Sequence, residues 1–260
     1  MEFLINIDTE HWIYLAMFLI AIIAGVVDAI AGGGGLITIP SLLLVGVPPM
    51  IALGTNKLQA VIGELTTSII FIKSQQVSIK GIFLGLSCTA IGAVVGAISV
   101  SLFDKSSLEI ILPILMVFIT IYSVTSNKLK ATSNSDAKIS TTQFMVMCGL
   151  LIGFYNGFFG PGTGSIWMLA FVILLGHTIK QATMATKPLN LVGNIFSLIF
   201  FIAIGHVDYR MGVVMGAGQI IGSFVGSKFV LNYGSGLVRP VFISVTVLMT
   251  GKLIYESLPI

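Results

Sequence analysis

Charged residues are scarce in this sequence. Asp, Glu, Lys and Arg make up 9% of its 260 residues, whereas hydrophobic residues make up 56%. Soluble domains average about 25% charged residues, so this chain has too few charges to cover a surface that faces water. The mean hydropathy of +1.05 agrees with this conclusion. The composition therefore predicts an all-α, polytopic membrane protein and argues against a soluble domain.

Cysteines and motifs of catalytic or nucleotide sites are also scarce. The two cysteines, Cys88 and Cys148, lie in apolar segments, so we expect neither a disulfide framework nor a metal site. No HExxH motif and no GxxxxGK[ST] motif occurs, and no Ser–His–Asp order fits the segments. We therefore expect no metal, no cofactor and no enzyme activity. The net charge of +3 comes from lysines near segment ends, which favours a role in membrane orientation over nucleic-acid binding.

The N-terminus lacks the basic residues of a secretory signal. It carries Glu2, Asp8 and Glu10 before the first apolar run and no Lys or Arg. Because a cleaved signal begins with a basic region, we expect the first segment to be retained.

Apolar segments of about 20 residues are long enough to span a membrane as helices. The sequence contains eight such segments, at residues 12–45, 49–72, 81–103, 108–124, 144–175, 182–204, 212–231 and 237–255. Glycine-rich stretches at residues 32–35 and 160–164 interrupt the first and the fifth. A polar linker, residues 127–142, separates the two groups of four. We expect a first transmembrane repeat at 1–126 and a second at 143–260.

The two halves align with each other. Gly25, Asp28 and Gly32 match Gly153, Asn156 and Gly160 at one offset; after a two-residue shift, Lys57, Glu64, Gly92 and Gly96 match Lys187, Asn194, Gly222 and Gly226. A broken segment, a buried lysine and a glycine ladder in the same order indicate an internal duplication. The four-residue spacing of the ladders, which include Cys88 and Gly218, predicts faces where helices pack closely in lipid.

The lysines of the loops predict the orientation. Lys73 and Lys80 flank the loop after the second segment, and Lys128, Lys130 and Lys138 occupy the linker. The positive-inside rule places both regions in the cytoplasm, and we expect the plasma membrane. The acidic N-terminus prefers the outside, which requires the broken first segment to return to the side where it starts. The halves are then inverted, a recurring transporter design that we favour; a first segment that crosses would make them parallel.

The glycine breaks are candidate binding sites. Gly33, Gly34 and Gly35 in the first half, and Pro161, Gly162, Thr163 and Gly164 in the second, cannot continue a helix well. Irregular backbone at membrane depth is tolerated only inside protein or beside water. Such a break exposes the N-terminus of the next half-helix, whose N–H groups favour an anion. The alternative is a hinge without a ligand.

Two lysines follow the breaks at equivalent positions. Lys57 and Lys187 each lie several residues inside an apolar segment, where a charge is costly. Snorkelling to an interface is the alternative to a binding role. With two half-helix N-termini they would form an electropositive centre that suits an oxyanion. Neutral donors for that anion are at hand in Thr55, Asn56, Thr163 and Thr186.

Amides and carboxylates accompany the lysines. Gln59 and Asn190 lie within one turn of them and are candidate ligands or partners in interhelical hydrogen bonds; the amide of Asn194 lies one turn further. Asp28 and Glu64 are candidate coupling residues, because carboxylates in membrane segments often mark ion pathways. Their alternative role is to neutralise a lysine; Lys57 and Glu64 are seven residues apart and share a helix face.

These motifs resemble the TauE/SafE family, also called the sulfite exporter or DUF81 family. The resemblance rests on Asp28, the glycine run and Pro40, then residues 54–57 (Gly-Thr-Asn-Lys), with a second signature from Gly153 through 160–164 to Thr186-Lys187. It covers nearly the whole chain. It implies a membrane permease for sulfite, sulfoacetate and related organosulfonates. Lys187 follows Ala-Thr and precedes Pro188, unlike Lys57, so the half-sites are not identical.

The resulting hypothesis is a secondary transporter for a small sulfur-containing oxyanion, coupled to protons through Asp28 or Glu64. The alternatives are an uncoupled anion channel of the same fold and a cation-coupled carrier of another small anion. The expected partners are a small anion and the lipid bilayer, without nucleic acid, and the sequence leaves a homodimer open. A cation carrier is disfavoured by the two lysines, and an intramembrane enzyme by the missing catalytic groups.

Overall fold

The computed structural model describes residues 2–74, 77–104, 106–108, 110, 111, 114 and 136–233, and this part is helical without strands. Its main helices are α1 (Glu2–Ala31), α2 (Gly35–Leu44), α3 (Pro49–Lys73), α4 (Ile79–Ser101), α6 (Thr141–Phe158), α7 (Thr163–Leu175), α8 (Ile179–Ala203) and α9 (Tyr209–Tyr233). Six predicted segments are confirmed, with ends within a few residues of the prediction, except that α1 begins at Glu2 and not near residue 12. Most of segment 108–124, all of segment 237–255 and linker residues 127–135 lie outside the described residues.

Both predicted breaks occur at glycines with a left-handed backbone. α1 ends before Gly32 (φ +72°), and the loop between α6 and α7 contains Gly160 (φ +97°) and Gly162 (φ +77°). A residue with a Cβ rarely adopts this conformation. The glycines therefore end the first helix of each half and let the chain reverse.

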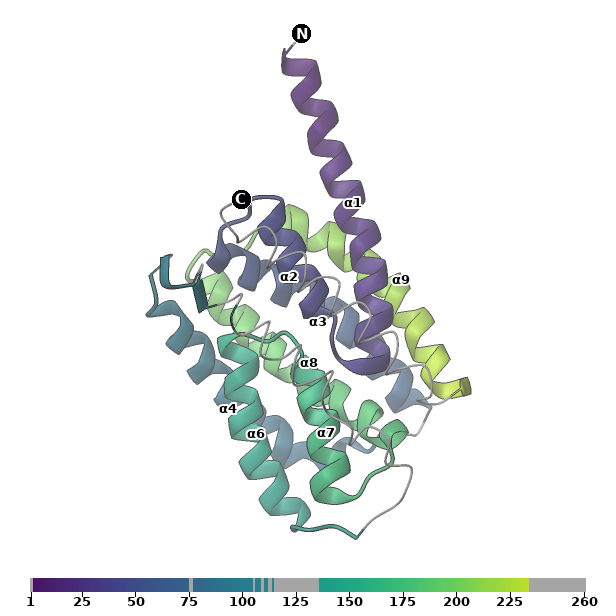
Figure 1. Cartoon of the computed structure of the whole chain (residues 1–260). Coiled ribbons are helices and arrows are strands. Elements are labelled where there is room, and N and C mark those ends of the chain that lie inside the picture. Colours follow the sequence, from purple (N-terminus) through teal and green to yellow (C-terminus); the bar gives the residue numbers. More distant parts are fainter. Residues whose placement is uncertain are drawn as a thin grey trace.

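After each break the chain folds back. Met17 and Ala21 of α1 belong to the same apolar cluster as Leu42 near the end of α2. In the second half, the N–H of Lys138, just before α6, donates to the carbonyl of Leu174 at the end of α7 (2.9 Å). Each broken segment is thus a helical hairpin, and the two hairpins enter from opposite ends of the molecule (Figure 1). The chain of the first segment therefore reverses its direction after Gly32; the inverted arrangement of the two halves stays a prediction.

The two halves pack reciprocally. α9 packs along α1 and α4 packs along α6, while α3 and α8 contact each other, with α9 also against α3 and α4 against α8. The glycine ladders lie at these contacts: a Cβ on Gly96 would overlap the carbonyl of Phe154, and one on Gly222 that of Ile22. This confirms the ladders as packing faces. The exchange of equivalent helices agrees with an internal duplication, which remains a prediction.

Within the described part of the chain, four helical stretches are long and apolar enough to span a membrane: His11–Ala31, Ile79–Ser101, Ile179–Ala203 and Tyr209–Asn232. α3 has 25 residues but is too polar to qualify by composition. Its polar side chains, among them Lys57 and Glu64, are buried inside the protein. The chain is therefore a helical membrane protein whose most polar helix is shielded by the others.

Candidate functional site

The two hairpins meet at their tips. A Cβ placed on Gly32 would overlap the backbone of Gly164, so the two breaks touch through their main chains. The Ser165 hydroxyl, at the start of α7, donates to the carbonyl of Ala31 at the end of α1 (2.6 Å). This contact joins the two halves and places the N-termini of α2 and α7 beside each other.

Lys57 of α3 binds the hairpin of the other half. Its side chain is fully buried. Its Nζ donates to the carbonyl oxygen of Asn156 (2.6 Å), to Oδ1 of Asn156 (2.8 Å) and to Oδ1 of Asn194 (3.1 Å). An ammonium has three donors, so all of them are used. Asn156 lies in the last turn of α6, where the helix dipole favours a cation.

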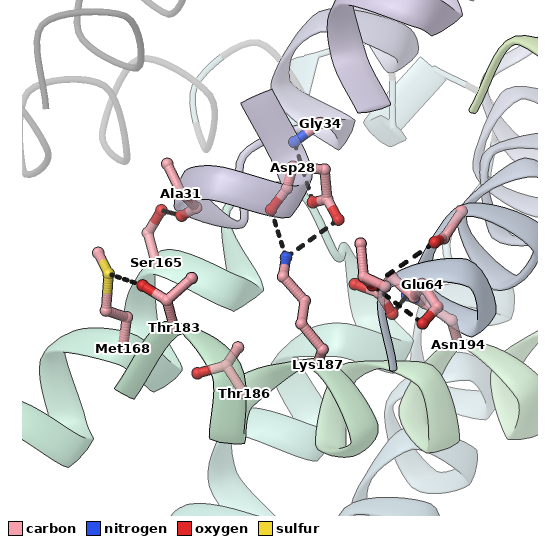
Figure 2. Close-up of polar contacts among 12 residues, drawn as sticks. Asp28, Ala31, Gly34, Glu64, Ser165, Met168, Thr183, Thr186, Lys187 and Asn194 are labelled. Atoms are coloured by element: carbon pink, nitrogen blue, oxygen red, sulfur yellow. Dashed lines mark hydrogen bonds and ion pairs between the residues drawn. The ribbon is translucent and has the colours of Figure 1, made fainter. Parts of the chain in front are cut away.

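Lys187 of α8 makes the corresponding contact with the first hairpin. Its Nζ donates to the carbonyl of Asp28 and forms an ion pair with Asp28 Oδ2 (3.2 Å). The other carboxylate oxygen, Oδ1, accepts from the N–H of Gly34 (3.2 Å). Figure 2 shows the Lys187 side chain extending from α8 to the carbonyl oxygen and to Oδ2 of Asp28. Because neither lysine is more than 1% exposed, the snorkelling alternative is wrong.

Glu64 is linked to Lys57 through an amide. Its Oε2 accepts from Nδ2 of Asn194 (2.9 Å), and the same Asn194 accepts from Lys57. Glu64 and Lys57 share a helix face, as their spacing predicts. They are linked through the amide of Asn194 and not by a direct hydrogen bond. The group contains two lysines and two carboxylates, so its formal charges cancel. The electropositive centre expected from the sequence is therefore balanced internally.

A cavity of about 20 Å³ lies at this crossing, which is room for about one water molecule. Its lining is polar backbone and small or polar side chains: Asp28, Gly32, Gly35, Asn56, Ala60, Glu64, Asn156, Gly160, Gly162, Thr163, Asn190 and Asn194. The Asn190 side chain is 3% exposed, and its Oδ1 has no hydrogen-bond partner. The site is closed in this conformation and is too small for an oxyanion of four heavy atoms.

Most of the predicted site residues lie at the cavity or at the helix breaks. Asp28, Gly35, Asn56, Glu64, Gly162, Thr163 and Asn190 line the cavity. Lys57 and Lys187 are bonded to its lining. Gly33, Gly34 and Pro161 belong to the breaks, and Gly164 lies in the first turn of α7.

Three predicted ligands are engaged elsewhere. Thr55 Oγ1 accepts from the N–H of Asp208 (2.9 Å), and the Thr186 hydroxyl donates to the carbonyl of Ala182 (2.8 Å). Gln59 donates to Thr38 Oγ1 (3.1 Å) and to Asn56 Oδ1 (2.8 Å). The Thr55 contact joins α3 to the residue before α9, the Gln59–Thr38 contact joins α3 to α2, and the Thr186 contact lies within α8. The lining of the cavity includes none of these three residues.

Sequence reasoning missed four residues of the site. Asn156 was recognised only as the repeat partner of Asp28, and Asn194 as the repeat partner of Glu64 and as an amide near Lys187. Neither was predicted to bind Lys57, although the repeat equivalence was a usable signal. Thr38, whose hydroxyl donates to Asn56 Oδ1 (2.6 Å), and Ser165 carry no such signal. Within the described ranges, no group of three or more His, Cys, Asp or Glu side chains could hold a metal ion.

Helical hairpins that meet inside a membrane protein, with buried ionisable groups around them, are typical of membrane transporters. The chain matches the family model described as Sulfite exporter TauE/SafE over residues 17–253. It belongs to this family.

Curated relatives agree with this membership. A "Probable membrane transporter protein" of Haemophilus influenzae is 38% identical over 241 residues, covering 93% of this chain and 94% of that protein. The "Probable membrane transporter protein YfcA" of Escherichia coli K12 is 41% identical over 241 residues, covering 93% and 89%. "Probable membrane transporter protein ORF9" of a Sinorhizobium species is 36% identical over 249 residues, covering 96% and 95%. No solved structure matches the chain.

Proposed function

We propose that this protein is a secondary transporter of a small sulfur-containing oxyanion, such as sulfite or an organosulfonate, in the plasma membrane. The observation that carries the proposal is the crossing of the two hairpins. There, the N-termini of α2 and α7 line one cavity, and two buried lysines are bonded to other residues of its lining. Ammonium groups and helix N-terminal amides both donate hydrogen bonds to oxyanions. The name of the family supports sulfite as the first candidate.

Transport requires the cavity to grow, because about 20 Å³ cannot hold the substrate. The hairpins touch at their tips, through Gly32, Gly164 and the Ser165–Ala31 hydrogen bond. We expect one hairpin to withdraw toward its own side of the membrane while the other stays closed. Such alternating access suits inverted repeats, with the linker 127–142 in the cytoplasm.

Asp28 and Glu64 supply the coupling in this proposal. Both are carboxylates at the cavity, and each is linked to a lysine, directly or through Asn194. The two lysines and two carboxylates have a net formal charge of zero. An anion that enters the cavity adds a negative charge, and a proton bound to one carboxylate would offset it. An uncoupled anion channel of the same fold, or coupling to another cation, would use the same cavity without this protonation.

Flux into proteoliposomes tests the proposal. The purified protein is reconstituted and supplied with labelled sulfite, sulfate or a short organosulfonate, with and without an imposed proton gradient. Accumulation of sulfite or the organosulfonate above the external concentration, driven by the proton gradient, is expected. Equal flux with and without the gradient would favour the channel, and uphill flux that follows a sodium gradient instead would favour another coupling ion. Absence of flux for every anion would refute the transporter assignment.

Chemical labelling tests the inverted topology. Glu2→Cys is made in a background without Cys88 and Cys148, and intact cells are treated with a membrane-impermeant thiol reagent. We expect labelling from outside. Protection in intact cells, with labelling only after lysis, would place the N-terminus in the cytoplasm and contradict inversion.

A further inference from the structure

The two lysines have partners of different charge. Asp28 and Asn156 occupy equivalent positions near the ends of α1 and α6, and each offers its carbonyl and its side-chain oxygen to the lysine of the other half. At Lys187 that side-chain oxygen belongs to a carboxylate. At Lys57 it belongs to a neutral amide. The two halves are thus alike in geometry and different in electrostatics.

The Asp28 carboxylate already fills the anion-binding position of its half. One oxygen pairs with Lys187 (3.2 Å) and the other accepts from the N–H of Gly34, at the start of α2 (3.2 Å). A lysine and a half-helix N-terminus are the two donors expected for a substrate anion. Asp28 therefore behaves as an anion tethered to the protein, and Figure 2 shows both of its contacts.

The other half-site has no carboxylate bonded directly to its lysine. Among the described residues, Lys57 contacts two neutral oxygens of Asn156 and one of Asn194, and the Glu64 carboxylate is joined to it only through the amide of Asn194. The N-cap residue of α7 is Gly162, which has no side chain that could cap the helix. Asn190, which lines the cavity together with Gly162 at that N-terminus, has an amide oxygen without a partner. This side of the cavity therefore combines a buried cation with polar groups that can change partners.

We propose that the oxyanion binds at the half-site of Lys57, Asn156 and Asn194 and that Asp28 excludes it from the half-site of Lys187. The proposal rests on the proposed function and adds which half receives the substrate. Displacing Asn156 Oδ1 from Lys57 exchanges a neutral acceptor for a charged one and strengthens the hydrogen bond. Displacing Asp28 from Lys187 would leave a partly buried carboxylate, and the fully buried lysine, without their counter-charges, which is unfavourable.

Exchanging the two side chains tests the proposal, because Asp and Asn have nearly the same shape. Sulfite binding to the purified protein is measured by titration calorimetry for wild type, Asn156→Asp, Asp28→Asn and the double exchange. Asn156→Asp places a tethered anion on Lys57 and should weaken binding by about tenfold or more, the loss expected for a charge-assisted hydrogen bond. Asp28→Asn removes a competing negative charge and should strengthen binding. The double exchange should regain affinity relative to Asn156→Asp, now at Lys187.

The outcomes separate this proposal from the proposed function. Wild-type binding that survives Asn156→Asp, or that Asp28→Asn abolishes, would overturn the assignment of half-sites while leaving an oxyanion transporter intact. A double exchange that does not regain affinity would overturn the role of Asp28 as a competitor. Absence of binding to the wild type would contradict the proposed function itself. The Asn156→Asp protein should fold, because its new carboxylate faces Lys57; gel filtration and thermal unfolding check this.

Discussion

The ion pair between Lys187 and Asp28 should stabilise the fold measurably. Replacing Lys187 with Met leaves the Asp28 carboxylate, whose side chain is 15% exposed, without its cation. Removing one partner of a buried pair costs about 3–5 kcal/mol. The N–H of Gly34 still donates to Asp28, so we expect the lower end of this range. At about 2–4 °C per kcal/mol for a chain of this size, the midpoint of thermal unfolding should fall by roughly 6–12 °C.

A double-mutant cycle isolates the pair. Asp28→Asn alone strands the Lys187 cation and should also lower the midpoint. The double variant Asp28→Asn/Lys187→Met contains neither charge, so its loss should be smaller than the sum of the single losses by about 1–3 kcal/mol, the range for coupled neighbours.

The assay is thermal unfolding of the detergent-purified protein, followed by tryptophan fluorescence. Lys80→Met is the matched control, since Lys80 is exposed and should change the midpoint by less than about 0.5 kcal/mol equivalent. Single losses that simply add in the double variant would refute the ion pair as a stabilising contact. So would a Lys187→Met midpoint equal to that of the control.

Three further predictions use the same unfolding assay. Gly160→Ala should destabilise the protein by about 1–3 kcal/mol of backbone strain plus crowding, because its Cβ would lie 2.5 Å from the Nζ of Lys57. Gly205→Ala, with φ +73° and no atom within 4 Å, carries strain alone; an equal loss in both would show that crowding at Lys57 is absent. Gly96→Leu should prevent α4 from packing on α6, so unaltered stability would contradict that contact. Burial lowers the pKa of His177, so the unfolded chain binds its proton more tightly and the stability should fall as the pH drops below about 6.5. His177→Phe keeps an aromatic ring at this position but cannot bind a proton, so it should reduce the pH dependence of stability. An unchanged pH dependence in this variant would contradict the burial of His177.

Helix positions were predictable because each depends on a local pattern. Apolar runs set the bounds of α3 and α8 to within a few residues, and the glycine-rich stretches located both breaks. No pattern in the sequence predicted that the chain reverses after each break. The reversal was inferred only because the inverted topology requires it. It depends on packing between residues as distant as Met17 and Leu42, which no local pattern encodes.

The residues of the site were predictable by type but not by partner. Repeat equivalence identified Lys57 and Lys187, yet their partners lie 99 and 159 positions away along the chain. Nothing in the sequence indicates that each lysine would reach across to the opposite hairpin. Thr55 and Thr186 illustrate the same limit: they are adjacent to the site in sequence, but the rotation of their helices directs their hydroxyls to other partners.

The most direct measurement is sulfite uptake by proteoliposomes that contain Lys57→Met, compared with wild type and with Lys80→Met. Methionine keeps the length of the buried side chain and removes only the charge and its hydrogen-bond donors. If the oxyanion binds at the crossing of the hairpins, Lys57→Met should fold and reconstitute but transport no sulfite, while Lys80→Met should transport at the wild-type rate. Sulfite uptake at the wild-type rate by folded Lys57→Met would contradict the site.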